Sequence, residues 1–144
     1  MGFDAAKVAE ILGGEKVLGQ RVESLADLHG VVARGLPLQA LEETARRVAG
    51  NSRAVTALKD RLVPRATRSR RTRLKVTESE RVERLARLMA IAEEVWENEE
   101  DARAFMNEPH ALLNGKPPLE LAETELGARR VEHLLMKLEY GLPV

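Results

Sequence analysis

The chain has 144 residues, enough for one domain with its own core or for two small helical modules that share one. It has no cysteine, which excludes disulfides, thiol catalysis and thiolate metal sites, and its 3% aromatic content favours a mostly α-helical fold. The formal net charge is zero, yet residues 1–75 hold 15 basic and 8 acidic side chains and residues 76–144 hold 8 and 15, so the two halves are predicted to meet different partners.

The apolar runs of the sequence are too short for a membrane span or an export signal. The first residues lack the apolar run of a signal peptide, and nowhere do about 18 uncharged apolar residues follow one another. We therefore expect a cytoplasmic protein that does not contact a membrane.

Two helices are predicted before residue 36. The first runs over residues 4–12, with Asp4 as its N-cap, and ends at the glycine pair 13–14. The second begins after Ser24, another capping residue, and ends at Gly35. Its apolar stripe is Leu25, Leu28 and Val32.

A pair of helices with a tight connection follows. Pro37 suits a first helical turn, and the pattern from there continues to Gly50. Asn51 or Ser52 can cap a second helix that ends near Val63. Two helices of about three turns, followed by a basic segment that opens with a proline, are typical of a helix-turn-helix unit.

The basic segment, residues 61–75, contains seven arginines and lysines and no acidic residue. Most charge runs are solvated faces or linkers, but seven like charges without a local counter-ion favour an anionic partner such as nucleic acid. The acidic half of the same chain is the alternative counter-charge. If Pro64 opens a third helix, the predicted DNA contacts are Arg65, Thr67, Arg68, Ser69, Arg70 and Arg71.

The sequence of the second half predicts four further helices and one turn. Thr77 and Glu80 form a capping box for a helix that runs to Trp96, which we expect to be a core residue together with Phe105 of a short helix ended by Pro109. Asn114-Gly115 predicts a turn, and the proline pair 117–118 a single helical turn. Thr124 can cap a last helix that reaches Gly141.

No catalytic constellation appears. The three histidines, His29, His110 and His133, stand far apart and are expected to be surface or capping residues. The acidic cluster over residues 93–101 is interpreted as solvated carboxylates with no buried setting. Gly13-Gly14 is not followed by the rest of a Walker loop. We predict a binding protein that is not an enzyme and uses no cofactor or metal.

The sequence resembles a known family. VPRATRSRRTRLKVTESERVERLARLMAIAEEVW and ARAFMNEPHALLNGKPPLELAETELGARRVEHLLMKLEYG are similar to the Xre/MbcA/ParS-type antitoxins of bacterial type II toxin-antitoxin systems. The resemblance covers roughly residues 36–142. Its most specific parts are the basic RSRR before the ESERVERLARL helix, the LNGKPPLEL turn, and TELGARRVEHLL with the closing EYG.

The resemblance implies an all-α fold in which an Xre-like helix-turn-helix DNA-binding domain (36–76) precedes a helical toxin-binding domain (77–144), here with an N-terminal helical extension (1–35). The implied partner is a RES-domain toxin that degrades NAD and whose active site the antitoxin covers. The complex would bind its own promoter as operator DNA, with the antitoxin as a homodimer. The implied toxin-binding residues are Asn114, Gly115, Lys116, Leu119, Arg130, Tyr140 and Gly141. The chain departs from many members by ending in Leu-Pro-Val.

Charge supports this interpretation. A pocket that binds the pyrophosphate of NAD must be basic, so acidic residues of the second half could compete with the substrate there. One alternative is a stand-alone transcriptional regulator whose C-terminal domain serves dimerisation, and another is an unrelated enzyme or scaffold.

Overall fold

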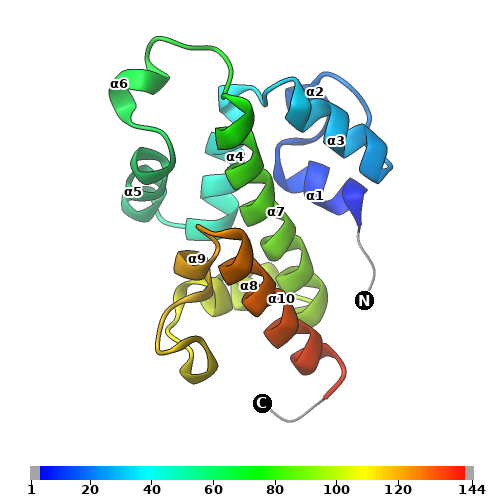
Figure 1. The fold of residues 1–144 in the computed structure, drawn as a ribbon, viewed down its shortest axis with the longest axis vertical. Coiled ribbons are helices and arrows are strands. Elements are labelled where there is room, and N and C mark those ends of the chain that lie inside the picture. Colours follow the sequence, from blue (N-terminus) through cyan, green and yellow to red (C-terminus); the bar gives the residue numbers. More distant parts are fainter. Residues whose placement is uncertain (1–3, 142–144) are drawn as a thin grey trace.

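The computed structural model describes residues 4–141 and is built from helices (Figure 1). Across these residues the regular elements are ten α-helices and one 3-10 helix, which confirms the predicted all-α fold class. In chain order they are α1 (Ala5–Ile11), α2 (Gly14–Leu18), α3 (Leu25–Ala33), α4 (Leu38–Ala49), α5 (Ser52–Leu62), α6 (Arg65–Arg68), α7 (Val76–Trp96), α8 (Glu99–Asn107), η1 (Ala111–Leu113), α9 (Pro118–Leu121) and α10 (Glu125–Glu139).

Four helices begin at the capping residues that the sequence predicts. In each case the side chain accepts a hydrogen bond from the backbone N–H three residues later, which satisfies one of the free donors of the first turn. The acceptor oxygen and donor nitrogen are 2.8–3.0 Å apart. The four caps are Asp4, Ser24, Asn51 and Thr124.

The predicted N-cap of α7, Thr77, was wrong by two residues, and so was the predicted capping box. Lys75 is the N-cap, and its N–H donates to Oε1 of Glu78 at 2.8 Å, so Glu78 takes the role expected of Glu80. The reason lies in the preceding strand-like pairing, where the N–H of Leu74 donates to the carbonyl of Leu36 at 2.8 Å. This pairing holds the chain extended up to Leu74, and the helix starts directly after it.

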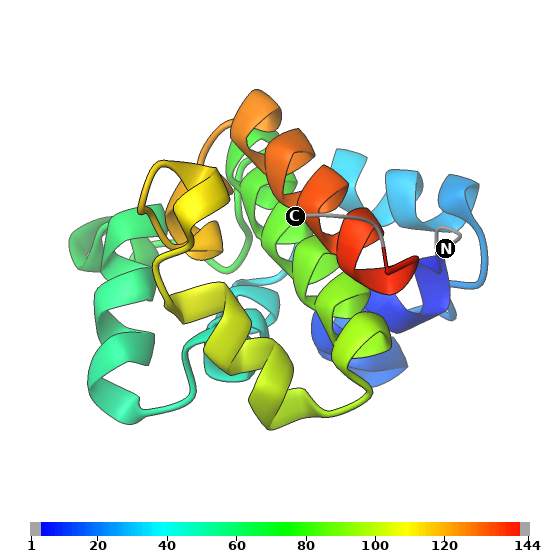
Figure 2. The same cartoon turned by 90° about the horizontal axis from the view of Figure 1, so that it is seen from below.

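Helix α7 is the centre of the fold. It packs against α1, α3, α4, α5, α8 and α10, and Figure 2 shows it crossing the molecule beneath α10. Val82, Leu88, Met89 and Ala92 on α7 are completely buried. They belong to one hydrophobic core that also includes side chains from the segments 1–35, 36–76 and 77–144, so the three predicted segments share a single core.

Helix α8 caps the C-terminal end of α4. Nε of Arg103 donates to the carbonyl of Arg47 at 3.0 Å, and Nδ2 of Asn107 donates to that of Val48 at 2.8 Å. These are carbonyls that the last turn of a helix leaves without a partner, and a cation suits the negative end of the helix dipole. Gly50 follows with a φ of +84°, and a Cβ on it would lie 2.7 Å from Cδ of Arg103. The close approach of α8 therefore requires a glycine there.

Two residues expected in the apolar stripes are exposed. Trp96, predicted as a core residue, is 41% exposed at the end of α7, while Phe105 is buried as predicted and lies 6.1 Å from it between ring centroids. Leu25 is 65% exposed.

The Leu-Pro-Val segment at 142–144 lies outside the described residues. In the part that is described, no helix is both long and apolar enough to cross a bilayer.

Candidate functional site

The loop of residues 110–117, which contains η1 and leads into α9, is closed by its own backbone hydrogen bonds. The N–H of His110 donates to the carbonyl of Lys116 at 3.2 Å, and the N–H of Gly115 donates back to the carbonyl of His110 at 3.0 Å. Asn114 and Gly115 have φ values of +58° and +75°, a left-handed conformation that these two residue types tolerate best. Nδ1 of His110 accepts from the N–H of Leu112, so this histidine is a capping residue, as predicted.

Arg130 of α10 holds the loop in place. Its Nη2 donates to Oδ1 of Asn114 at 2.8 Å and to the carbonyl of Leu112 at 3.2 Å. Two of the predicted toxin-binding residues, Asn114 and Arg130, are thus in direct contact although 16 positions separate them in the sequence.

The position of α10 depends on Gly127. A Cβ on this residue would lie 2.0 Å from the carbonyl oxygen of Leu121 at the end of α9, far inside van der Waals contact. Arg84 of α7 donates to the carbonyls of Ala122 and Glu123 at 2.9 and 3.2 Å, which fixes the same connection from the other side. The loop, α9 and α10 therefore form one rigid unit on α7.

A cleft of about 210 Å³ lies between the loop and α10. Its lining residues are Leu112, Leu113, Arg130, His133, Leu134 and Lys137. Large apolar side chains are exposed nearby: Leu112 is 45% exposed and Leu126, on the first turns of α10, is 75% exposed. Exposed apolar side chains around polar ones are typical of a protein-binding surface.

The other predicted toxin-binding residues are less closely grouped. Gly115 and Lys116 are exposed in the same loop. Leu119 is half-buried in a shallow depression with Leu58 and Leu62 of α5, away from the cleft, where it contributes to the core. Tyr140 and Gly141 are exposed at the far end of α10, about 15 Å along the helix axis from Arg130.

The charge around the cleft differs from that of the half to which it belongs. The acidic residues of α10 lie on its other flank, where Glu132 pairs with Arg87 at 3.3 Å and Glu125 with Arg84 at 3.5 Å. The cleft itself presents Arg130, His133 and Lys137. The cleft side of α10 is therefore basic, in contrast to the net charge of residues 76–144.

The basic segment forms less helix than the sequence suggests. Helix α6 is only four residues long, and the chain from Ser69 to Lys75 contains no further helix. The expected lack of counter-ions was wrong, because three of the seven basic side chains pair with carboxylates. The pairs are Arg61 with Glu123, Arg68 with Asp60, and Arg71 with Glu78.

The six predicted DNA contacts fall into two groups. Arg68 donates from Nη1 to the carbonyl of Val63 at 2.6 Å and to Asp60 at 2.8 Å, and the Nη2 of Arg71 lies 2.9 Å from Oε2 of Glu78. The hydrogen bond to Glu78 raises the pKa of Arg71. Both side chains therefore stabilise the segment itself. Arg65, Ser69 and Arg70 are exposed, and Thr67 is half-buried. Oγ of Ser69 and Nε of Arg70 donate to the carbonyl of Ala66 at 2.9 and 3.2 Å, but the guanidinium of Arg70 has no carboxylate partner among the described residues.

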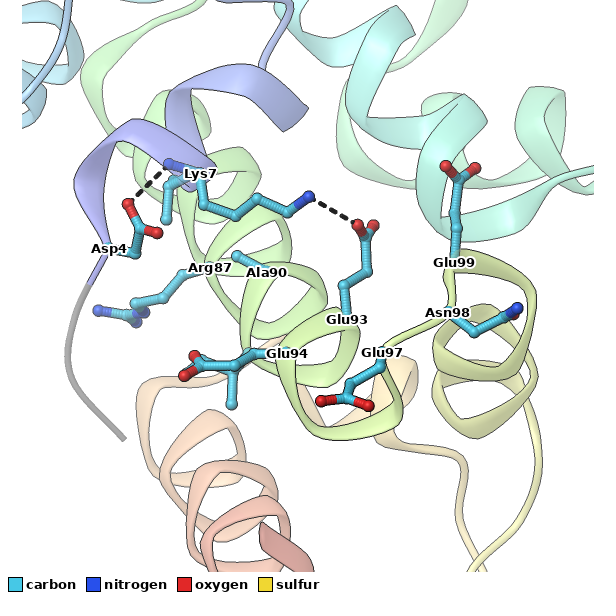
Figure 3. Close-up of a pocket in the computed structure, with 11 residues that line it drawn as sticks. Asp4, Lys7, Arg87, Ala90, Glu93, Glu94, Glu97, Asn98 and Glu99 are labelled. Atoms are coloured by element: carbon cyan, nitrogen blue, oxygen red, sulfur yellow. Dashed lines mark hydrogen bonds and ion pairs between the residues drawn. The ribbon is translucent and has the colours of Figure 1, made fainter.

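A second cleft, of about 360 Å³, lies where α1, α7 and the start of α8 meet (Figure 3). Here the interpretation of the acidic cluster as fully solvated was wrong for Glu93, whose side chain is 7% exposed and whose Oε1 lies 3.0 Å from Nζ of Lys7. Glu94 and Glu97 are exposed, as predicted.

Among residues 4–141, no three histidine, aspartate or glutamate side chains are arranged to hold a metal ion.

Of the six residues that line the first cleft, only Arg130 was predicted as a site residue. Sequence reasoning missed the other five: Leu112, Leu113, His133, Leu134 and Lys137. A signal was present, because residues 126, 130, 133 and 137 recur at helical spacing and must share one face of α10. That face carries a leucine, an arginine, a histidine and a lysine, and no carboxylate.

The C-terminal part of the chain is similar to a known family of domains. Residues 92–141, which include α8, the loop, α9 and α10, match the model of the antitoxin Xre/MbcA/ParS C-terminal toxin-binding domain family. The chain is also 31% identical over 87 residues to a curated protein of Pseudomonas putida named Antitoxin Xre. The alignment covers 58% of this chain and 55% of that relative, so the chain spans about half of the relative's length.

Proposed function

We propose that this chain is the antitoxin of a type II toxin-antitoxin pair and that residues 77–144 bind the cognate toxin. The observation that carries the proposal is the family match over residues 92–141. The matched residues build the loop that Arg130 holds against α10 and the cleft beside it. A rigid surface with exposed apolar side chains loses little entropy on binding, which favours a stable complex.

The toxin in this proposal is a RES-domain enzyme that degrades NAD. The support is the resemblance of the ESERVERLARL, LNGKPPLEL and TELGARRVEHLL segments to antitoxins of such pairs. The antitoxin acts as a stoichiometric inhibitor that covers the entrance of the active site and takes no part in catalysis.

The second activity is binding of the operon's own promoter by the complex, which represses its transcription. Helices α4 and α5 and the basic segment supply the DNA-binding domain, and Arg65 and Arg70 are exposed and available for phosphate contacts. A homodimer is expected, because helix-turn-helix proteins usually contact two half-sites about one turn of DNA apart.

Co-expression tests the antitoxin proposal. The chain is expressed with the product of the adjacent reading frame, with a tag on only one of them, and NAD is measured in cells with and without the chain. We expect a stable complex and a loss of NAD only when the chain is absent. Titration of the purified toxin should reach full inhibition at a fixed molar ratio. Complete inactivation by a substoichiometric amount would contradict a stoichiometric inhibitor.

The exposed arginines of the basic segment favour one other function, that of a stand-alone transcriptional regulator. In that case no complex forms and NAD is unchanged, while the chain alone binds the DNA upstream of its gene with a steep salt dependence.

A further inference from the structure

Helix α10 separates its charges by flank. Glu125 and Glu132 face α7, where they pair with Arg84 and Arg87. On the opposite flank, Arg130, His133 and Lys137 line the cleft beside the loop, and none of its lining residues in the described chain is acidic. A local positive surface is therefore built into a half of the chain that has seven more acidic than basic residues.

Within residues 4–141, no carboxylate forms an ion pair with the arginine or the lysine of the cleft, Arg130 and Lys137. The hydrogen bonds that Arg130 donates go to the carbonyl of Leu112 and the side-chain amide of Asn114, which are both uncharged. These bonds fix the guanidinium at the wall of the cleft while its charge stays available. A fixed cation that needs no reorganisation is a strong partner for a carboxylate, because its hydrogen bonds are charge-assisted.

Size and surroundings indicate which anion fits. The cleft of about 210 Å³ lies below the roughly 300–1,000 Å³ of typical small-molecule pockets, so a nucleotide is a poor occupant. Leu112 and Leu126 are exposed beside the basic group. Apolar side chains that surround a polar centre are the arrangement found at protein interfaces, where they exclude water from the charged contact.

We propose that this cleft receives an acidic segment of the toxin, with a carboxylate between Arg130 and Lys137 and apolar side chains against Leu112 and Leu126. The inference rests on the proposed antitoxin function and deepens it, since it names the chemistry of the toxin surface that α10 contacts. It also reverses the polarity suggested by the charge of residues 76–144: the toxin is acidic where it meets α10.

Opposite-charge substitutions on the two flanks of α10 test the proposal. Lys137→Glu changes the charge at the cleft, and Arg129→Glu makes the same change on a side chain that is 66% exposed and lies 3.9 Å from Glu125 on the other flank. We expect Lys137→Glu to raise the Kd of the toxin complex about 10- to 100-fold. For Arg129→Glu, which removes only a surface pair, the expected change is about twofold or less.

Controls separate binding from folding. Both variants should unfold at the same temperature as the wild type, and Lys137→Ala, which introduces no new charge, should weaken the complex in the same direction as Lys137→Glu. The wild-type Kd should rise steeply with salt, and this dependence should be smaller for Lys137→Ala. Equal Kd values for the wild type and the Lys137 variants, or equal losses on both flanks, would overturn the proposal.

Carbodiimide cross-linking of the wild-type complex gives an independent result. The reagent joins a lysine amine to a carboxylate only when the two are in contact. We expect mass spectrometry to find Lys137 linked to an aspartate or glutamate of the toxin. Cross-links from other lysines with none from Lys137 would contradict the inference while leaving the antitoxin function intact. If the wild-type chain binds no toxin and NAD falls in its presence, both proposals fail together.

Discussion

The guanidinium of Arg47 and the carboxylate of Glu93 lie edge to edge, joined by two hydrogen bonds of 2.7 Å, from Nε to Oε2 and from Nη2 to Oε1. This geometry matches the two donors of arginine to the two acceptors of a carboxylate. Lys7 adds a third contact to Glu93 at 3.0 Å. Helices α1, α4 and α7, which come from all three predicted segments of the chain, therefore meet at one partly buried ion cluster around Glu93.

Glu93→Gln is expected to lower the free energy of unfolding by about 2–3 kcal/mol, because removal of one partner leaves the other charges without compensation. The cost stays below that of a fully buried pair, since Arg47 keeps contacts to Glu10 and Glu99 at 3.4 and 3.3 Å. Urea unfolding of the wild type and the variant measures this loss of stability. Glu94→Gln, on the exposed neighbouring residue, is the matched control and should change stability by less than about 0.5 kcal/mol.

The same cluster predicts a dependence of stability on pH. Burial opposes the charge of Glu93, but the hydrogen bonds from Arg47 and Lys7 outweigh it and the pKa of Glu93 lies below its ordinary value of 4.5. The pKa of Glu78 is lowered as well, first by its hydrogen bond from Arg71. A lowered pKa contributes stability that is complete above the unfolded value and is lost as the pH falls through the native value.

We therefore expect the free energy of unfolding to fall once the pH drops below about 4.5. The Glu93→Gln variant should lose less over this interval than the wild type, because one of the titrating groups is gone. Unfolding curves at neutral pH and at several acidic pH values check this. A variant that lost as much stability on acidification as the wild type would show that Glu93 does not contribute.

Gly127→Ala should destabilise the protein and weaken toxin binding, although alanine is the better helix former. The new Cβ would meet the carbonyl oxygen of Leu121 at 2.0 Å, and the separation of α9 and α10 that relieves this contact costs about 1–3 kcal/mol. Gly30→Ala in α3 is the control, since its Cβ would lie 3.4 Å from the flexible end of Arg34. That variant should gain up to about 1 kcal/mol. Thermal unfolding of both variants distinguishes steric from helix-propensity effects.

The arginines of the basic segment should separate into two classes in DNA binding. Arg65→Ala is expected to leave stability unchanged, and Arg70→Ala to lower it only slightly, because its hydrogen bond to the carbonyl of Ala66 is exposed to water. Each should reduce the slope of log Kd against log salt by about one. Arg71→Ala should lower the free energy of unfolding, since Glu78 loses its charged partner. Fluorescence anisotropy with the upstream DNA at several salt concentrations measures the DNA binding, and thermal melts measure the stability. Identical behaviour of the three variants would contradict the division.

Local signals explain which parts of the structure could be predicted. Asp4, Ser24, Asn51 and Thr124 act as caps because a side-chain oxygen and a nearby backbone N–H settle the helix start without help from the rest of the fold. The turn at Asn114-Gly115 is local for the same reason. The start of α7 depends instead on the pairing of Leu74 with Leu36, which are far apart in sequence, and no capping pattern contains that information.

The candidate site divides in the same way. The resemblance predicted both Asn114 and Arg130 as toxin-binding residues. Only the tertiary structure shows that the two side chains are in contact, through a hydrogen bond between the loop and α10. Net charge was a poor guide to the charge at the cleft, because Glu125 and Glu132 of α10 turn toward α7 while Arg130 and Lys137 line the cleft. The long basic segment likewise gave no sign that Arg68 and Arg71 have partners within the chain.

The single core has a consequence for the lifetime of the protein. Because side chains from all three predicted segments pack around α7, the described chain offers a protease no independent linker to cut between a DNA-binding and a toxin-binding part. Degradation then requires cooperative unfolding of the whole, and its rate follows the population of the open state. Under the proposed function, inhibition of the toxin and repression of the promoter would end together, and loss of one antitoxin molecule would release both the toxin and the gene for its inhibitor.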